Sequence, residues 1–226
     1  MCGRFAMSGD LDFYRGYYGV DEVDTDPLDQ SWNVAPTDET YVVAEHDEKR
    51  YLGRMAWGLI PHWAEDRSTI HINARVETVT TKPAFKRALA RHRCLIPADG
   101  FYEWEPKEKG RTPHWVYRAD GHPMSFAGIW SAWRDPDTDL WVRRFAIITT
   151  EAAGPIARVH DRMPVILPDD TWEAWLDRDL TDPEAARSLI RTIDPDLVME
   201  HEVSSRVNSV RNNGPELVDA ATDTLF

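Results

Sequence analysis

The chain has 226 residues, of which 42% are hydrophobic and ten are Trp, so its composition excludes a disordered protein and its length fits one large domain. The formal net charge of −13 argues against a general affinity for nucleic acid, and no apolar run approaches the roughly 18 residues that span a bilayer. The two cysteines form no CxxC pattern and there is no HExxH motif, so we expect a cytoplasmic protein without disulfides, bound metal or cofactor.

Short apolar or alternating runs, separated by turn residues, recur along the chain and predict strands. They are CGRFAM, TYVVAEH, LGRMAWGLI, RCLIPADGFYEW, HWVYRA, SFAGIW and VRRFAIITT. The acidic stretch 21–31 is loop-like. Residues 80–92 predict a helix, with a Thr cap, an early Pro and an apolar pair at Phe85 and Leu89, and two acid-capped helical segments follow near the C-terminus. Strands with helices added at the edges predict a single α+β domain over residues 1–226.

Charge is distributed unevenly along the chain. Residues 49–160 hold 18 basic and 12 acidic side chains, whereas the segments on either side are strongly acidic. Asp outnumbers Glu by 24 to 15 and Arg outnumbers Lys by 21 to 5, which indicates adaptation to a salty cytosol. The basic middle, with a stretch 78–98 that lacks any acidic residue, then indicates a phosphate-bearing partner. An ordinary solvated helix face explains that stretch equally well.

Cys2, one of only two cysteines, directly follows the initiator methionine. Because Cys is small, we expect Met1 to be removed, which leaves an α-amine and a thiol on adjacent carbons. Both groups supply some nucleophile near neutral pH, since their ordinary pKa values lie within about two units of pH 7. Such a pair can attack an acyl group with the amine as base, or close a ring on an aldehyde. A merely tolerant position 2 is the simpler interpretation of the cysteine alone.

Other segments carry side chains that a nucleophilic cysteine would need. Asn73 and Arg75 are two residues apart and would share one face of a strand. Glu103 lies between two aromatic residues, where partial burial would raise its pKa toward general-acid use, unless the segment is an edge strand and Glu103 faces water. His160 precedes an apolar run and is flanked by arginines. Each of these signals is weak by itself.

Six motifs follow one another along the chain: MCGRFA, WNVAPT, WGLIPHW, NAR followed by ET, RCLIPADGFYEW and HDRMPVIL. So arranged, they resemble the SRAP family, named for SOS-response-associated peptidase, and the resemblance extends to VNSVRNNGPEL at 207–217. It implies one domain with a strand-rich, barrel-like antiparallel core and peripheral helices. It also implies binding of single-stranded DNA and covalent capture of abasic sites, which protects the lesion during replication and repair.

The resemblance implies a catalytic role for four residues. The amine of Cys2 would attack the aldehyde of the open abasic sugar to give a Schiff base, and its thiol would then add to the imine and close a thiazolidine. Glu103 would donate and accept protons in both directions of this reaction. His160 would stabilise the open sugar or shuttle protons there, and Asn73 would hold the reacting group in place.

The resemblance divides DNA binding between charge and stacking. Arg75 and Arg162 would bind the phosphates beside the lesion, with Arg4 as a third cation, and Trp57 and Trp104 would stack on the flanking bases. Stacking contributes about 1–3 kcal/mol per base and depends little on salt, whereas phosphate contacts weaken as salt rises. We expect a monomer that needs no membrane or metal and that is associated with the nucleoid when bound to DNA.

Three other functions remain open from the sequence. Class II glutamine amidotransferases also begin with MCG and use the terminal Cys to hydrolyse an amide, but we find none of the glutamine-recognition segments expected downstream. A thiol peptidase that removes its own leader, as the family name suggests, would share Cys2, Glu103 and His160, and a lyase activity is also compatible with capture. A non-catalytic binder of modified bases would not require Cys2.

Overall fold

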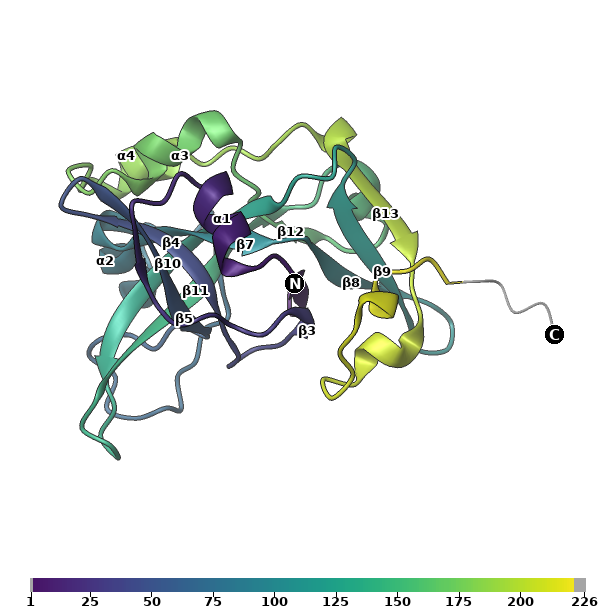
Figure 1. Ribbon diagram of the computed structural model, residues 1–226, viewed down its shortest axis with the longest axis horizontal. Helices are drawn as coiled ribbons and strands as arrows, with labels where there is room; N and C mark the ends of the chain where they lie inside the picture. Colours follow the sequence, from purple (N-terminus) through teal and green to yellow (C-terminus); the bar gives the residue numbers. More distant parts are fainter. Residues whose placement is uncertain (1, 222–226) are drawn as a thin grey trace.

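Thirteen strands and four short α-helices make up residues 2–221, the part of the chain that the computed structural model describes (Figure 1). The strands are β1 (Phe5–Met7), β2 (Glu22–Asp24), β3 (Ser31–Val34), β4 (Glu39–His46), β5 (Lys49–Trp57), β6 (Asn73–Arg75), β7 (Arg93–Ala98), β8 (Gly100–Pro106), β9 (Arg111–Arg118), β10 (Met124–Arg134), β11 (Trp141–Glu151), β12 (Arg162–Pro164) and β13 (Val198–Glu202). The helices are α1 (Leu11–Tyr17), α2 (Pro83–Arg91), α3 (Trp172–Leu176) and α4 (Pro183–Ser188). None of these helices is long and apolar enough to cross a bilayer.

The larger sheet closes into a five-stranded barrel. Antiparallel pairing joins β11, β10, β7, β4 and β5 in that order, and β5 then pairs with β11 in parallel. The short strands β2 and β6 also pair in parallel, with β5 and β11 respectively. Closure satisfies the backbone groups that would otherwise lie along two open edges. The predicted α+β class with a barrel-like core is confirmed, and these short parallel pairs are the departure from a wholly antiparallel core.

The smaller sheet has the strand order β13-β9-β8-β1-β3, and residues from both of its faces are buried in apolar clusters. On β8, Phe101 packs into the main core, whereas the next residue, Tyr102, joins a second cluster that includes Trp115 and Val207. Cys2 is completely buried, and Phe5 and Met7 of β1 also belong to the main core. The first described residues therefore lie in the interior of the fold.

The seven predicted strand runs are all present, and the run RCLIPADGFYEW supplies both β7 and β8. The loop-like stretch 21–31 contains the short strand β2. Sequence patterns missed helix α1, whose N-cap residue Asp10 accepts a hydrogen bond from the N–H of Phe13 over 2.7 Å. This helix spans only two turns, so its apolar period is too short to be distinctive.

The predicted helix at 80–92 is α2, with Phe85 and Leu89 buried as expected. The predicted Thr cap is wrong, because Lys82 occupies the N-cap position and makes no side-chain cap hydrogen bond. Arg93, from the basic stretch, is buried and donates to the carbonyl oxygens of Leu89, Trp175 and Leu180 over 2.6–2.9 Å. Its guanidinium group therefore stabilises the packing of the helices and does not face a phosphate at the surface.

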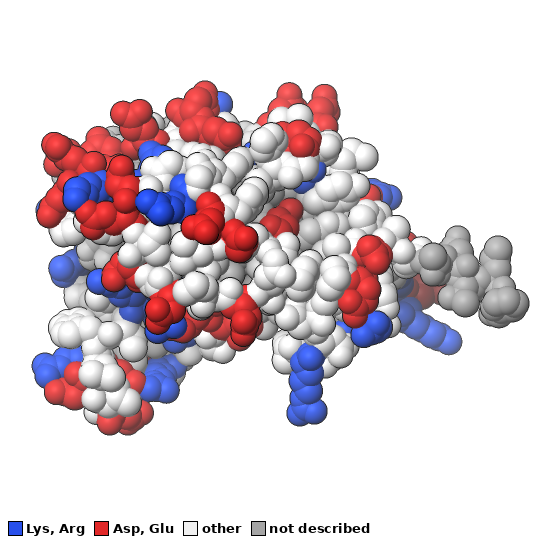
Figure 2. All heavy atoms as spheres, viewed as in Figure 1, with Lys and Arg blue, Asp and Glu red and all other residues white. Residues whose placement is uncertain are grey.

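Acidic side chains gather at the upper edge of the face in Figure 2, over α3 and α4. Residues 161–226, which include both helices, hold 15 acidic and 6 basic side chains. This edge repels a polyanion, so DNA would have to approach elsewhere.

Gly100 provides a test of how tightly β8 is packed. A Cβ atom at this position would collide with the carbonyl oxygen of Val116 and would lie 2.6 Å from the ring of Trp115. Because a backbone atom cannot move aside without moving its strand, Gly100→Ala should lower the free energy of unfolding by about 1–3 kcal/mol. Gly16→Ala, in α1, meets no atom within 4 Å and should raise it by about 0.5–1 kcal/mol. Urea titrations in which both variants changed the free energy of unfolding in the same direction would contradict this packing.

Candidate active site around Cys2

Cys2 lies just before β1 and is completely buried within the main hydrophobic core. β1 is an inner strand between β3 and β8, so backbone hydrogen bonds hold it from both sides. The N–H of Tyr102 donates to the carbonyl oxygen of Arg4 over 2.9 Å. The side-chain Nδ2 of Asn73 donates to the carbonyl oxygen of Cys2 over 2.8 Å. The cysteine is therefore fixed through its own backbone.

Glu103 lies in the middle of β8 and is only 3% exposed. Since β8 is an inner strand between β1 and β9, the alternative that Glu103 faces water from an edge is wrong. Burial raises the pKa of its carboxyl group, and His160 partly opposes that rise through its charged form. Burial also raises the pKa of the Cys2 thiol, and the negative charge of Glu103 raises it further. These mutual effects place Cys2, Glu103 and His160 in one cluster.

His160 is half-buried and follows the 3-10 helix η1 (Gly154–Arg158). Its Nδ1 accepts a hydrogen bond from the backbone N–H of Arg162 over 2.9 Å. Oδ1 of Asp161 also lies 2.8 Å from Nδ1, but a carboxylate cannot hydrogen-bond to a nitrogen that is already an acceptor. Because the Asp161 side chain is 83% exposed, we assign the backbone contact. The neutral ring then carries its proton on Nε2.

Asn73 and Arg75 lie on β6 and pair with Ile147 and Thr149 of β11. Being two residues apart on a strand, they share one face, as predicted. Asn73 is half-buried and bound to Cys2, whereas Arg75 is exposed to solvent. This strand therefore carries a residue of the buried cluster and, beside it, a cation that can reach a ligand on the surface.

Arg162 differs from the prediction because it points inward. Its Nη2 donates to the carbonyl oxygen of Thr149 over 2.7 Å and to Oε2 of Glu77 over 3.0 Å, and these bonds to Arg162 lower the pKa of Glu77. Arg162 is 9% exposed. A phosphate would have to displace Glu77, so the predicted phosphate contact by Arg162 does not fit this structure. Arg162 instead fixes β12 and, through its N–H, the ring of His160.

Arg4 and Trp104 form a unit with the segment after β13. Nη1 of Arg4 donates to Oδ1 of Asn33 over 2.6 Å and to the carbonyl oxygen of Val207 over 2.8 Å. The Arg4 guanidinium carbon lies 5.9 Å from the centre of the Trp104 ring. The indole N–H of Trp104 donates to Oδ1 of Asn208 over 2.7 Å. Both side chains are half-buried, so Arg4 acts mainly as a support for the indole, which keeps part of its surface exposed.

A family model described as "SOS response associated peptidase (SRAP)" matches residues 1–210. The chain belongs to this family. Among curated relatives, it is 37% identical to the Bacillus subtilis protein named abasic site processing protein YoqW, over 97% of this chain and 100% of that one. It is 32% identical to abasic site processing protein YedK of Escherichia coli, over 96% and 99% of the two chains. It is 30% identical to abasic site processing protein HMCES of Xenopus tropicalis, over 87% and 68%.

A solved structure of a Bacteroides thetaiotaomicron protein shares the fold, with a TM-score of 0.85 at 27% sequence identity over 98% of this chain and all of that one. The SRAP match also decides between the two families considered above whose members begin with MCG. The glutamine amidotransferase alternative is therefore set aside for this chain.

Trp57 has a structural role in this SRAP domain, and its predicted stacking on a base is wrong. The ring is completely buried, 5.2 Å from the ring of Phe5 and stacked on Phe145, so it has no free face. Its indole N–H donates to the carbonyl oxygen of Ile72 over 2.8 Å, just before Asn73. The exposed aromatic residue of the same WGLIPHW motif is Trp63, at 56%. The motif alone could not say which of its two indoles faces the solvent.

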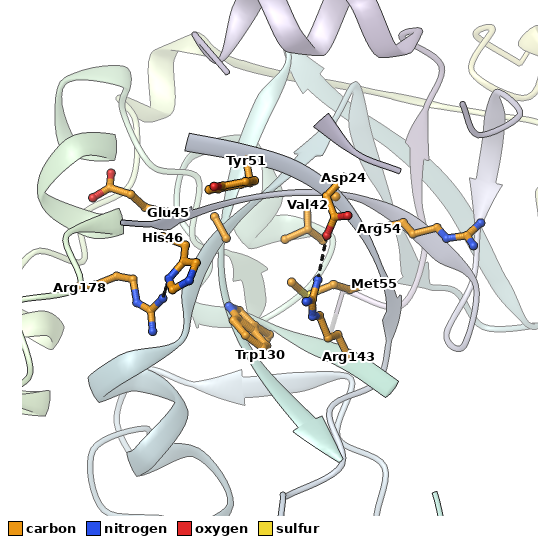
Figure 3. A pocket seen from close by; sticks show the side chains of 12 residues that line it. Asp24, Val42, Glu45, His46, Tyr51, Arg54, Met55, Trp130, Arg143 and Arg178 are labelled. Atoms are coloured by element: carbon orange, nitrogen blue, oxygen red, sulfur yellow. Dashed lines mark hydrogen bonds and ion pairs between the residues drawn. The ribbon is translucent and has the colours of Figure 1, made fainter. Parts of the chain in front are cut away.

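A hollow of about 300 Å³ lies on the outside of the barrel, away from this cluster (Figure 3). Its lining includes Trp130, Tyr51 and Arg143, whose guanidinium group is 3.3 Å from Asp24. None of the predicted site residues lines it. We therefore place the candidate active site at Cys2 on chemical grounds, because no cysteine or serine lines this hollow.

The raised pKa of Glu103 makes a prediction about stability. The folded state holds the carboxyl proton more tightly than the unfolded state, whose pKa is about 4.5. The stability gained from this is present below that pH and is lost as pH rises through the folded pKa. Glu103→Gln cannot ionise, so its free energy of unfolding, relative to that of the unmodified protein, should increase as pH rises from about 4 toward 8 and then level off.

Urea titrations across this range measure the difference, with Glu108→Gln as the control. Glu108 is exposed in the turn after β8, so its difference from the unmodified protein should stay nearly flat. Parallel curves for Glu103→Gln and the unmodified protein would show that Glu103 is not perturbed by burial.

Proposed function

We propose that this protein captures abasic sites in single-stranded DNA by forming a covalent bond through Cys2. Relatives that share at least 30% of its sequence are named abasic site processing proteins, which supports the substrate. The observation that carries the proposal is the cluster of the buried Cys2 and Glu103 with the half-buried His160, with Asn73 bound to the cysteine backbone. The proposal requires removal of Met1, because an acylated amine cannot form a Schiff base.

The reaction joins an aldehyde to the amine and thiol of one residue. The α-amine of Cys2 attacks the aldehyde carbon of the open-chain sugar, and one water molecule leaves as the Schiff base forms. The thiol then adds across the C=N bond, its proton passes to the nitrogen, and a five-membered thiazolidine closes. An internal cysteine lacks the free amine, so position 2 is essential to this chemistry.

The buried side chains divide the proton transfers. A raised pKa keeps the Glu103 carboxyl group protonated nearer to neutral pH, so it can donate the proton that the departing water takes. The raised pKa of the Cys2 thiol keeps that group protonated, so the amine reacts first. His160 offers a donor at Nε2 for an oxygen of the open sugar, and Asn73 holds the cysteine in one orientation.

For binding, we propose a phosphate contact by Arg75 and base stacking by Trp104. Arg75 is exposed on the strand that carries Asn73, and Trp104 is held by Arg4 and Asn208 with part of its ring exposed. A self-processing thiol peptidase would use the same Cys2, but no contact in the structure favours it over capture.

Intact mass spectrometry tests the capture directly. Protein with verified loss of Met1, incubated with a single-stranded oligonucleotide from which one uracil has been excised, should gain the mass of the strand less one water. Cys2→Ser should lose this stable adduct because its imine cannot close the thiazolidine. An N-terminal extension before Cys2 should abolish the adduct as well. A full yield of adduct from the extended protein would contradict the mechanism.

Salt dependence should separate the two kinds of DNA contact. In a Cys2→Ala background, which cannot close the thiazolidine, and with an oligonucleotide that has no abasic site, Arg75→Ala should weaken binding of single-stranded DNA and reduce the salt slope by about 0.7. Trp104→Ala should weaken binding to a similar degree at every salt concentration. Arg187→Ala, on the acidic helix α4, is the control and should change little. Fluorescence anisotropy across salt measures all three, and penalties that change in parallel would reject this division.

A further inference from the structure

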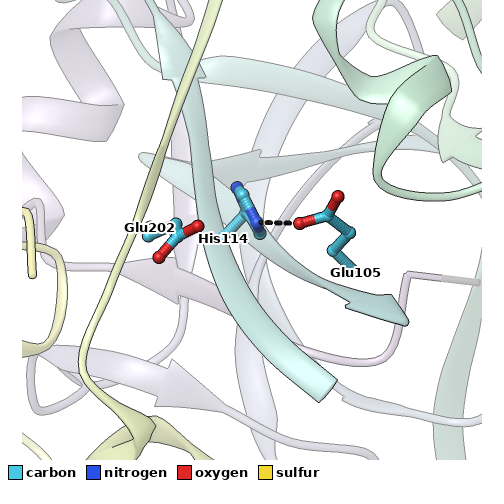
Figure 4. Close-up of side chains that lie close together, drawn as sticks. All are labelled: Glu105, His114 and Glu202. Carbon is cyan, nitrogen blue, oxygen red and sulfur yellow. Dashed lines mark hydrogen bonds and ion pairs between the residues drawn. The ribbon is translucent and has the colours of Figure 1, made fainter. Parts of the chain in front are cut away.

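Three neighbouring strands bring an imidazole and two carboxylates together on one face of the smaller sheet. Across the sheet, His114 of β9 pairs with Glu202 of β13 on one side and with Glu103 of β8 on the other. Glu105 is two residues beyond Glu103, so it points to the same face. Figure 4 shows the side chains of Glu105, His114 and Glu202 converging, and one donor atom from each lies within 4.8 Å of the other two.

The orientation of His114 is set by a fourth side chain, Glu200. His114 is 2% exposed, and its Nδ1 lies 2.6 Å from Oε2 of Glu200, whose own side chain is 5% exposed and ion-paired with Arg158. A carboxylate can only accept a hydrogen bond, so Nδ1 carries the hydrogen. In the neutral ring, Nε2 then carries a lone pair, and this lone pair faces Oε2 of Glu105 at 3.3 Å.

A hydrogen on Nε2 would let the ring donate to Glu105, and a metal ion between the two groups would take the place of that hydrogen. Lys107 balances part of the charge, with its Nζ 2.5 Å from the same oxygen of Glu105. It contacts the carboxylate of Glu105, and its ammonium group is the cation that an ion at this position would have to displace or share the carboxylate with. The exposed carboxylate of Glu202 adds a second negative group at the same place.

We propose that Glu105, His114 and Glu202 bind a divalent transition-metal ion, with Zn²⁺ or Mn²⁺ as the ions that suit one imidazole and two carboxylates. Glu200 holds the imidazole from behind, which is the usual arrangement of a metal-binding histidine and its carboxylate partner. The carboxylates must move closer than they stand, and both belong to long side chains that are at least partly exposed. Water reaches this side and completes the coordination.

The ion would join β8, β9 and β13 and so hold the last strand against the one that carries Glu103. This departs from our expectation from the sequence, which rested on the absence of CxxC and HExxH patterns. Those patterns describe ligands that are close in sequence, whereas these three lie on three strands and meet only through sheet pairing.

Isothermal titration calorimetry with Zn²⁺ tests the site in Cys2→Ala protein, since the thiol and amine of Cys2 are themselves zinc ligands. We expect one ion per chain, and at least a tenfold loss of affinity for both Glu202→Gln and Glu105→Gln, about the loss seen on removal of a group that supports a metal site. Glu108→Gln, in the same hairpin but outside the cluster, should bind as the parent does. Mg²⁺ should give little heat because it disfavours imidazole.

Thermal unfolding supplies the second readout, because an ion that binds only the folded state raises the midpoint temperature. Zn²⁺ should raise it in the parent and in Glu108→Gln but not in Glu202→Gln, and circular dichroism checks that each variant is folded. Glu202 is exposed, so its substitution should not prevent folding. Equal affinity in all variants would assign the heat to other histidines and overturn the proposal, as would the absence of binding in the parent.

Discussion

The structure depends on the pairing of the first strand of the chain with strands far along the sequence. β1 lies between β3 and β8, and three residues before it the carbonyl oxygen of Cys2 accepts a hydrogen bond from Asn73. A terminal segment is ordinarily poorly ordered, because few contacts oppose its conformational entropy. Here main-chain hydrogen bonds on both sides oppose it. The nucleophile is therefore already ordered in the folded protein. The entropic cost of ordering it arises on folding and not when a substrate binds.

Burial then sets the chemistry of the groups around the cysteine. Burial raises the pKa of both the Cys2 thiol and the Glu103 carboxyl group, and the negative charge of Glu103 raises the pKa of the thiol further. A protonated thiol resists oxidation, and it reacts once an electrophile has formed beside it. A protonated carboxyl group is the acid that an imine-forming reaction needs. Burial therefore favours the protonated form of both the thiol and the carboxyl group.

Several of the arginines stabilise the fold and do not face a phosphate. Arg93 is buried among carbonyl oxygens between helices, and Arg162 is paired with Glu77. Arg4 supports the Trp104 ring. Arg75 remains exposed on the strand that carries Asn73, on a molecule whose surface over α3 and α4 is acidic. Any phosphate binding here would involve few cations. At high salt, stacking and the covalent bond would therefore supply most of the affinity for DNA.

Family membership and most of the strands could be predicted from the sequence, because motif order and period-two alternation are local properties of the chain. The shared face of Asn73 and Arg75 followed from their spacing alone. Helix α1 was too short to show its period, and the cap of α2 depended on which of several adjacent residues the chain selected.

Tertiary structure decided the environment of each side chain. Glu103 is buried because β8 became an inner strand, and no pattern within RCLIPADGFYEW distinguishes an inner strand from an edge. Trp57 is buried while Trp63 of the same motif is exposed, because barrel closure at β5 and β11 covers one indole only. His114 meets Glu105 and Glu202 through register across three strands. Alternation determines which residues share a face, but long-range pairing determines what that face meets.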